Sequence, residues 1–227
     1  MRVVVSVGGS VLAPELDPER VTAYATAIEQ LVADGCDVGV VVGGGGVARE
    51  YIETARALGA NEVELDNLGI GTTRLNARLL IAALDDRANL SPATGYDEAA
   101  AALRRSEVSV MGGVTPGQTT DAVAAAFAES VAADLLVYAT SVPGVFSADP
   151  NVDADAERFD ELTAGELVDV ISSIETAAGS NAPVDLLAAK IIERSGLRAV
   201  VLDGSEPGRI ADAVGGDTPG TEVHPNE

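Results

Sequence analysis

Hydrophobic residues along the chain form two alternating patterns: short, nearly continuous runs and longer stretches with helical spacing. The clearest runs are Val3–Val7, Val38–Val42, Val108–Met111 and Leu135–Ala139. Short valine-rich runs of this kind are typical of strands that are buried on both faces of a parallel sheet. Two further strands are predicted at Ala199–Leu202 and Gly220–Val223.

Stretches with helical spacing separate these strands. Asp17 and Pro18 begin the first of them as a cap and a proline at the first helical position, and Gly35 stops it. Further helices are predicted over 47–58, 66–84, 97–105, 120–132, 163–174 and 184–195, and residues 142–160 predict an irregular loop over a site. Strands that alternate with helices need crossover connections. The predicted fold class is therefore α/β, a three-layer α/β/α sandwich with a mainly parallel central sheet.

Glycine or small hydroxyl residues follow each of the four clearest runs. These turns are Gly8-Gly9-Ser10, Gly43–Gly46, Gly112-Gly113 and Thr140-Ser141. Because the carboxyl ends of parallel strands meet at one edge, turns without bulky side chains place rows of backbone N–H groups there, and phosphate binds at such an edge. The four turns together predict an extended site for a polyphosphate. For any single turn, the alternative is that glycine only ends a strand and starts a helix.

The length and the rarest reactive residues narrow the class of protein. A chain of 227 residues can bury a full-sized core. Cys36 is the only cysteine and His224 the only histidine, so a disulfide framework, a thiolate metal cluster and a catalytic histidine base are disfavoured. No apolar run approaches the roughly 20 residues that span a bilayer. Because Met1-Arg2 leads directly into a strand, we expect a cytoplasmic protein with no membrane partner.

The balance of charge is strongly acidic. Asp and Glu number 36 against 14 Lys and Arg, the formal net charge is −22, and Lys190 is the only lysine. Such a surface repels polyanions, so nucleic acid is not an expected partner. A hydrophobic content of 47% argues against disorder. We interpret the charge as adaptation to concentrated salt, in which screening shortens the range of electrostatic repulsion.

Two common nucleotide-binding motifs do not fit the sequence. Residues Gly43–Gly46 are not followed by the third glycine of the dinucleotide-binding fingerprint. The chain also contains no glycine-rich phosphate loop that ends in lysine and a hydroxyl residue. A nicotinamide-dependent dehydrogenase stays open as an alternative.

The order of the turns and of several further motifs resembles the amino acid kinase superfamily, and within it the archaeal-type UMP kinases. The opening Val5–Leu12 and the second turn, Val41–Gly45 with Ala48–Ile52, are similar to the superfamily. The motifs similar to archaeal-type UMP kinase are Asp66–Gly69, Thr73–Ala77, Met111–Ala122, Thr140–Pro150 and Asp185–Ile191. The match runs in order over essentially the whole chain, which is far more specific than one glycine turn. Together with the acidic composition, it suggests a haloarchaeal member.

The resemblance implies a magnesium-dependent enzyme that transfers the γ-phosphoryl group of ATP to UMP and forms UDP and ADP. It implies one domain over 1–227, with an acceptor-nucleotide half at about 1–130 and an ATP-binding half at about 131–227. The expected partners are UMP and ATP, Mg²⁺ accompanies the ATP, and the expected assembly is a homohexamer. Positioning and charge neutralisation dominate such phosphoryl transfer.

The resemblance also implies roles for individual residues. The residues expected to bind ATP are Gly9, Ser10, Gly45, Arg49, Thr140, Phe146 and Asp149. Those expected to bind UMP are Gly44, Asp66, Val114, Thr115, Pro116, Gly117, Gln118, Thr119 and Thr120. Arg49 and Asp121 are expected to be catalytic. Plainer interpretations exist, because Asp66 and Thr120 suit helix caps. Arg49 suits a solvated helix face, and Phe146 suits packing within a loop.

Two positions depart from the superfamily pattern. Ser6 stands where many relatives carry a lysine aimed at the transferred phosphoryl group, and Asp185 aligns with their second lysine. Asp121 matches an aspartate that organises those lysines, so its role here is open. Positive charge must then come from magnesium, Arg49, helix N-termini and, as a further candidate, Lys190. No metal ligand is assigned.

Two other functions stay open at this point. One is a different superfamily kinase that acts on carbamate, acetylglutamate or isopentenyl phosphate, and the missing lysines and the motif Gly117–Asp121 argue against it. The other is a non-catalytic oxyanion-storage protein of similar fold, and the scarcity of histidine argues against it.

Overall fold

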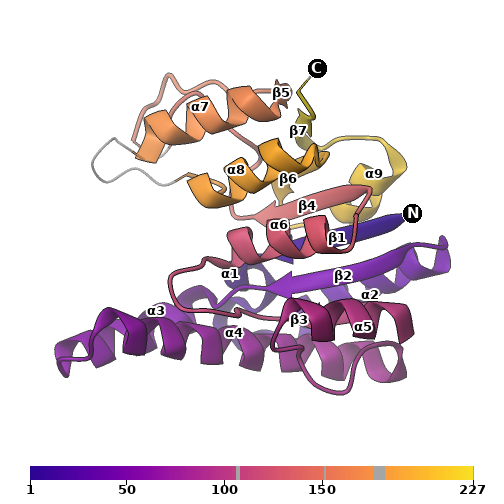
Figure 1. Ribbon diagram of the computed structural model, residues 1–227, viewed down its shortest axis with the longest axis vertical. Helices are drawn as coiled ribbons and strands as arrows, with labels where there is room; N and C mark the ends of the chain where they lie inside the picture. Colours follow the sequence, from indigo (N-terminus) through magenta and orange to yellow (C-terminus); the bar gives the residue numbers. More distant parts are fainter. Residues whose placement is uncertain (106–107, 151, 176–181, 227) are drawn as a thin grey trace.

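A twisted sheet forms the centre of the protein (Figure 1). The computed structural model describes residues 1–105, 108–150, 152–175 and 182–226. Within them, the sheet has seven strands in the order β3-β2-β1-β4-β6-β7-β5. The strands are β1 (Arg2–Val7), β2 (Asp37–Val42), β3 (Val108–Met111), β4 (Leu135–Thr140), β5 (Glu161–Thr163), β6 (Ala199–Asp203) and β7 (Gly220–His224). All neighbours pair in parallel except β6 and β7, which are antiparallel.

Helices cover both faces of this sheet. They are α1 (Gly9–Leu12), α2 (Pro18–Ala33), α3 (Gly45–Ala57), α4 (Glu62–Leu84), α5 (Tyr96–Arg105), α6 (Thr120–Ser130), α7 (Ala164–Glu175), α8 (Leu186–Ser195) and α9 (Arg209–Gly215). Two short 3₁₀ turns lie at Pro14–Leu16 and Asp85–Arg87. Helices α5 to α8 pack on one face, and α1, α2, α4 and α9 on the other. The predicted three-layer α/β/α class with a mainly parallel sheet is confirmed.

Alternate residues of the central strands serve two separate cores. Val3, Val5 and Val7 of β1 pack with the layer that contains α2, whereas Val4 packs with the layer that contains α6. All four valines are fully buried, which explains why the run is apolar at successive positions. Burying each such side chain contributes about 1.5–3 kcal/mol. The one polar residue of the run, Ser6, points toward the site described below.

A glycine inside β2 allows α6 to approach the sheet closely. A β-carbon built at Gly39 would lie 2.6 Å from Cε1 of the Phe127 ring, which is fully buried. The ring thus occupies the space that a side chain at residue 39 would fill. Glycine is costly within a strand, so this close packing accounts for its presence.

Capping residues decide where several helices begin, and some predicted starts are wrong. Helix α4 begins at Glu62, four residues before the predicted start at residue 66. Asn61 Oδ1 accepts from the Glu64 backbone N–H (3.1 Å), and Glu64 Oε2 accepts from the Asn61 backbone N–H (2.8 Å). This reciprocal cap places Asp66 inside the helix, so the interpretation of Asp66 as a cap is wrong.

The other caps lie close to their predicted places. Asp17 caps α2 as predicted, with Oδ1 3.0 Å from the Glu19 backbone nitrogen. Helix α6 is capped by Thr119 and not by Thr120, so the capping interpretation of Thr120 is also wrong. Helix α8 begins at Leu186 after an Asp185 cap, two residues later than predicted.

Some short helices and strands were not predicted. Helix α1, helix α9 and strand β5 are too brief to show a hydrophobic period, and none of them was predicted. The predicted loop at 142–160 is confirmed for its described residues, which contain only an isolated bridge between Phe146 and Arg158. In Figure 1 the carboxyl ends of the central strands point left, and α3 with the start of α4 projects beyond them.

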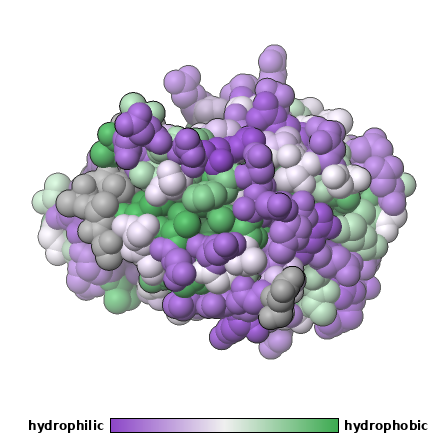
Figure 2. All heavy atoms as spheres, turned by 90° about the horizontal axis from the view of Figure 1, so that it is seen from above, coloured by the Kyte–Doolittle hydropathy of each residue, from purple (hydrophilic) through white to green (hydrophobic). Residues whose placement is uncertain are grey.

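The surface matches the acidic composition. Figure 2 shows hydrophilic residues over most of the face that it presents, with apolar side chains recessed between them. Among the helices that the structure describes, none combines the length and hydrophobicity that crossing a bilayer requires.

Candidate active site

Two glycine turns touch each other at the carboxyl edge of the sheet. A β-carbon built on Gly9, the first residue of α1, would lie 2.3 Å from the backbone nitrogen of Gly45 and 2.5 Å from the carbonyl oxygen of Gly43. Gly45 also has φ of +65°, a conformation that favours glycine. The turn after β1 and the N-terminus of α3 therefore share one space without side chains between them.

Helix α4 fixes the turns after β2 and β3. Asn76 is buried, and its Nδ2 donates to the carbonyl oxygens of Gly43 (2.9 Å) and Gly44 (3.1 Å). Thr73 Oγ1 accepts from the Gly113 backbone N–H (2.7 Å). Thr73 and Asn76 lie in the motif Thr73–Ala77, but no role was predicted for either residue. Their spacing of three residues on one helix face was the signal of a shared role.

The turns enclose a cavity of about 200 Å³, which we call the phosphate cavity. It is lined by Ser6, Gly8, Gly9, Ser10, Gly43, Gly44, Gly45, Arg49, Thr120, Asp121, Ala139, Thr140, Ser141 and Pro183. Backbone N–H groups and a helix N-terminus suit an anion here. The structure thus brings together residues predicted for ATP, for UMP and for catalysis. Arg49, the one basic residue of this lining, is exposed on α3.

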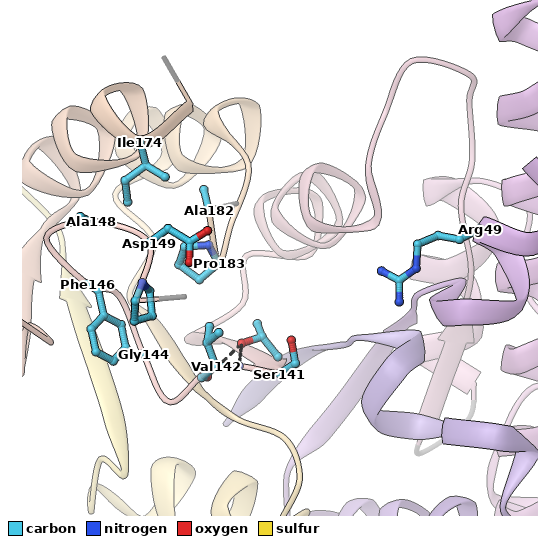
Figure 3. A pocket seen from close by; sticks show the side chains of 12 residues that line it. Arg49, Ser141, Val142, Gly144, Phe146, Ala148, Asp149, Ile174, Ala182 and Pro183 are labelled. Carbon is cyan, nitrogen blue, oxygen red and sulfur yellow. Dashed lines mark hydrogen bonds between the residues drawn. The ribbon is translucent and has the colours of Figure 1, made fainter. Parts of the chain in front are cut away.

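A second cavity of about 330 Å³ adjoins the first, and Figure 3 shows its lining. We call it the donor cavity because Phe146 and Asp149, which were predicted to bind ATP, line it. It is lined by Arg49, Thr140, Ser141, Val142, Gly144, Phe146, Ala148, Asp149, Pro150, Ile174, Ala182 and Pro183. Figure 3 shows Arg49 reaching in from α3, on the opposite side from Phe146 and Asp149. The two cavities share Arg49, Thr140, Ser141 and Pro183. Every residue predicted to bind ATP therefore lies in one continuous hollow.

Most residues predicted to bind UMP line neither of these cavities. Asp66 lies on α4, and its Oδ2 accepts from the Gly117 backbone N–H (2.8 Å), which ties the helix to the turn that precedes α6. Gly117 has φ of +81°, so glycine suits this turn. The same turn contains Val114, Thr115, Pro116, Gln118 and Thr119. Asp66 and this turn form a separate group beside the phosphate cavity. Gly44 and Thr120, the other two residues predicted to bind UMP, line the phosphate cavity itself.

Among the residues that the structure describes, Asp121 is the only carboxylate that lines the phosphate cavity. Burial, and then the nearby negative charge of Asp185, raise the pKa of Asp121 to about 7, and a weak hydrogen bond from Ser6 Oγ (3.4 Å) opposes this shift. The Tyr138 hydroxyl donates to the Asp121 carbonyl oxygen (3.0 Å). Near neutral pH Asp121 therefore holds a proton in a large fraction of molecules.

The described residues fit a magnesium ion that arrives on the phosphates of ATP. Among them, no three His, Cys, Asp or Glu side chains gather into a set that would hold a metal by themselves. Magnesium usually keeps several waters and binds through substrate phosphates with few protein ligands. The glycine-rich phosphate cavity, with one carboxylate, is consistent with that mode of binding.

Comparison with known proteins identifies the family. The model of the amino acid kinase family matches residues 1–203. The chain belongs to the amino acid kinase family. This membership confirms the resemblance that the ordered motifs indicated.

Several members of the amino acid kinase family are similar over their full length. A uridylate kinase of Halorubrum lacusprofundi is 75% identical over 99% of this chain and 94% of its own length. One of Natronomonas pharaonis is 69% identical over 100% of both chains. The crystal structure of a uridylate kinase from Archaeoglobus fulgidus has a TM-score of 0.89 and 46% identity, covering 98% of this chain and all of that one. The roles of individual site residues stay predictions.

Removing the charge of Asp121 should change the stability of this amino acid kinase in a pH-dependent way. Because the pKa of Asp121 is raised to about 7, the folded protein binds this proton more tightly than the unfolded chain does. The stabilising effect of the proton is full near pH 4 and is lost as the pH rises toward 7. Relative to the unchanged protein, Asp121→Asn should therefore gain stability through this window, by about 4 kcal/mol, and change no further above it.

Chemical unfolding at a series of pH values in concentrated potassium chloride measures this difference. Asp17→Asn, which makes the same exchange at an exposed helix cap that lines neither cavity, serves as the control for the substitution itself. A constant difference between Asp121→Asn and the unchanged protein from pH 4 to 8 would contradict the raised pKa.

Proposed function

We propose that this chain is a magnesium-dependent UMP kinase, which transfers the γ-phosphoryl group of ATP to UMP and forms UDP and ADP. The observation that carries the proposal is the continuity of the donor cavity with the phosphate cavity, next to the turn that Asp66 holds. The names of the full-length relatives, all uridylate kinases, support the same acceptor.

The donor half of the reaction uses the continuous hollow. Phe146 and Pro183 offer apolar surface to the adenine base, and the backbone N–H groups of the glycine turns face the phosphates. Ser10, Gly45 and Arg49 would hold the magnesium–ATP complex. Magnesium neutralises charge on the phosphates when it is bound. Arg49 adds a fixed positive charge at the junction of the two cavities, where the transferred group has to pass.

The acceptor half uses Asp66 and the turn before α6. A carboxylate accepts hydrogen bonds from the two ribose hydroxyls of a nucleotide, and Asp66 is half-buried beside Gly117. Gly44 and Thr120 extend this group into the phosphate cavity, so the UMP phosphate would meet the ATP phosphates there. A protonated Asp121 reduces the repulsion between the protein and these phosphates.

Other functions are less well supported. Kinases that act on carbamate, acetylglutamate or isopentenyl phosphate share the fold, but the relatives with high identity have the name uridylate kinase. An oxyanion-storage protein would not need the donor cavity beside the phosphate cavity. Neither alternative is favoured.

Three further properties belong to this proposal. Cytoplasmic pyrimidine biosynthesis is inferred from the resemblance. Assembly into a hexamer is inferred in the same way, and exposed leucines along one side of α4, Leu75 (59%) and Leu79 (41%), are suited to contact with another copy. A halophilic habit is inferred from the net charge of −22 and is supported by relatives from Halobacterium salinarum and Haloarcula marismortui.

A test of acceptors checks the reaction directly. In concentrated potassium chloride with magnesium and ATP, release of ADP should be rapid with UMP and slow with carbamate, acetylglutamate or isopentenyl phosphate. A coupled spectrophotometric assay measures the release. Absence of turnover with UMP, or equal turnover with one of the other acceptors, would refute the proposal.

Replacing Asp66 should weaken the binding of UMP alone. Asp66→Asn removes the negative charge but keeps one oxygen that can accept from the Gly117 backbone N–H, so the turn should stay in place. Because a charged acceptor strengthens hydrogen bonds to the ribose, the KM for UMP should rise about tenfold. The KM for ATP should change little. Steady-state kinetics with each substrate varied in turn measure both values.

A matched control is Asp97→Asn, which neutralises an exposed carboxylate in the first turn of α5. It should leave both KM values unchanged. If Asp66→Asn behaved like this control, Asp66 would only hold the turn, and its assignment to UMP would be wrong.

The protein should also depend on salt. Below about half-molar salt the screening length grows, so repulsion among the surface carboxylates extends further. We expect loss of structure and of turnover in this range, recoverable with concentrated potassium chloride. Circular dichroism and the ADP assay over a salt series follow the two properties. Full activity in dilute buffer would disprove the halophilic inference and leave the kinase proposal intact.

A further inference from the structure

The capping side chains of α6 and α8 are bonded to each other. Thr119 Oγ1 accepts from the Ala122 backbone N–H (3.1 Å) at the start of α6, and Asp185 Oδ1 accepts from the Ala188 backbone N–H (2.9 Å) at the start of α8. The Thr119 hydroxyl in turn donates its hydrogen to Asp185 Oδ2. Both carboxylate oxygens of Asp185 and the hydroxyl hydrogen of Thr119 thus take part in hydrogen bonds. These bonds link the N-terminus of α6 to the N-terminus of α8.

This bond joins parts of the site that are assigned to different nucleotides. Thr119 ends the turn in which Gly117 contacts Asp66, on the acceptor side. Asp185 lies two residues after Pro183, which lines both the phosphate cavity and the donor cavity. The two residues are 66 positions apart in the chain, and α6 packs against α8 behind them. The bond therefore sets where the acceptor turn lies relative to the donor wall.

Asp185 also affects the charge of the phosphate cavity. Asp121 follows Thr119 by two residues and faces Ser6 on β1 and Tyr138 on β4. Arg49 of α3 lines the same cavity. The negative charge of Asp185 contributes to the raised pKa of Asp121. Asp185 thus affects the charge of the phosphate cavity although it does not line that cavity.

We propose that Asp185 is a positioning residue for phosphoryl transfer, which holds the acceptor turn against the donor wall through Thr119. The role rests on the proposed function. When two substrates must meet end to end, the rate of transfer between them falls steeply if one of them is displaced. The bond therefore affects the rate of transfer more than the binding of either nucleotide alone.

Asp185→Asn tests this role with little change to the fold. Asparagine caps a helix about as well as aspartate, so α8 keeps its start. With the asparagine oxygen bonded to Ala188, its Nδ2 cannot accept the Thr119 hydroxyl hydrogen, so the charge-assisted bond is lost and only a weaker neutral bond in the reverse direction can replace it. At saturating UMP and ATP, kcat should fall about tenfold or more. Asp17→Asn, the same exchange at the cap of α2, should keep the kcat of the unchanged protein and show a similar melting temperature to Asp185→Asn.

The pH dependence separates this role from a purely structural one. Loss of the Asp185 charge should lower the pKa of Asp121, which ¹³C carboxyl NMR of the ligand-free protein measures. Thr119→Val removes the hydroxyl but keeps the charge of Asp185. It should reduce kcat by a similar factor, while the midpoint of the Asp121 titration stays above that of Asp185→Asn. The double variant should be no slower than the slower single variant, because both changes act on the same bond.

Three results would overturn the inference: an unchanged kcat in Asp185→Asn, multiplicative losses in the double variant, or an Asp121 midpoint that does not move in Asp185→Asn. No turnover of UMP by the unchanged protein would refute the proposed function instead. The two failures are distinguishable because the carboxyl titration needs no turnover.

Discussion

The site depends on the direct contact of two backbone turns. Gly9 lies so close to Gly43 and Gly45 that a methyl group on it would overlap backbone atoms. Because no side chain can separate the turns, their N–H groups and the start of α3 face one small cavity. Asn76 holds the second turn from α4 by bonding the carbonyl oxygens of Gly43 and Gly44, and the Gly43 backbone N–H donates to the carbonyl oxygen of Val7 (2.8 Å). The packing of the backbone thus forms a cavity that suits an anion.

This arrangement has to work with few positive charges. The chain has a net charge of −22 and a single lysine. Within the described part of the chain, Arg49 is the one basic residue that lines either cavity. Oriented N–H groups and helix dipoles supply partial positive charge without a basic side chain. Burial of Asp121 beside Asp185 favours its neutral form. Both effects lower the repulsion that a polyphosphate would meet in an acidic protein.

Local sequence signals predicted much of the fold. The valine runs and the Asp17 cap were sufficient for the central strands and α2, because each signal lies within a few residues. The start of α4 was misplaced, although Asn61 and Glu64 were visible, because the apolar stripe begins later than the cap.

The site was predicted less completely than the fold. The residues assigned to ATP do share one hollow. The functional contacts of Asn76 and Asp185 depend on partners more than 30 residues away, and no local pattern records such pairs. The separation of Asp66 from the phosphate cavity likewise follows from how α4 packs, and its role with UMP stays a prediction.

The contact between Gly39 and Phe127 has a consequence for how the sequence can change. The aromatic ring fills the place of the missing side chain, so the two residues share one fixed volume. Position 39 can gain a methyl group only if position 127 loses atoms, and each change alone leaves either a clash or a void. The two positions are therefore expected to vary as a pair, although 88 residues separate them. Because α6 carries Asp121 in the lining of the phosphate cavity, a mismatch in this pair would change the cavity by tilting that helix.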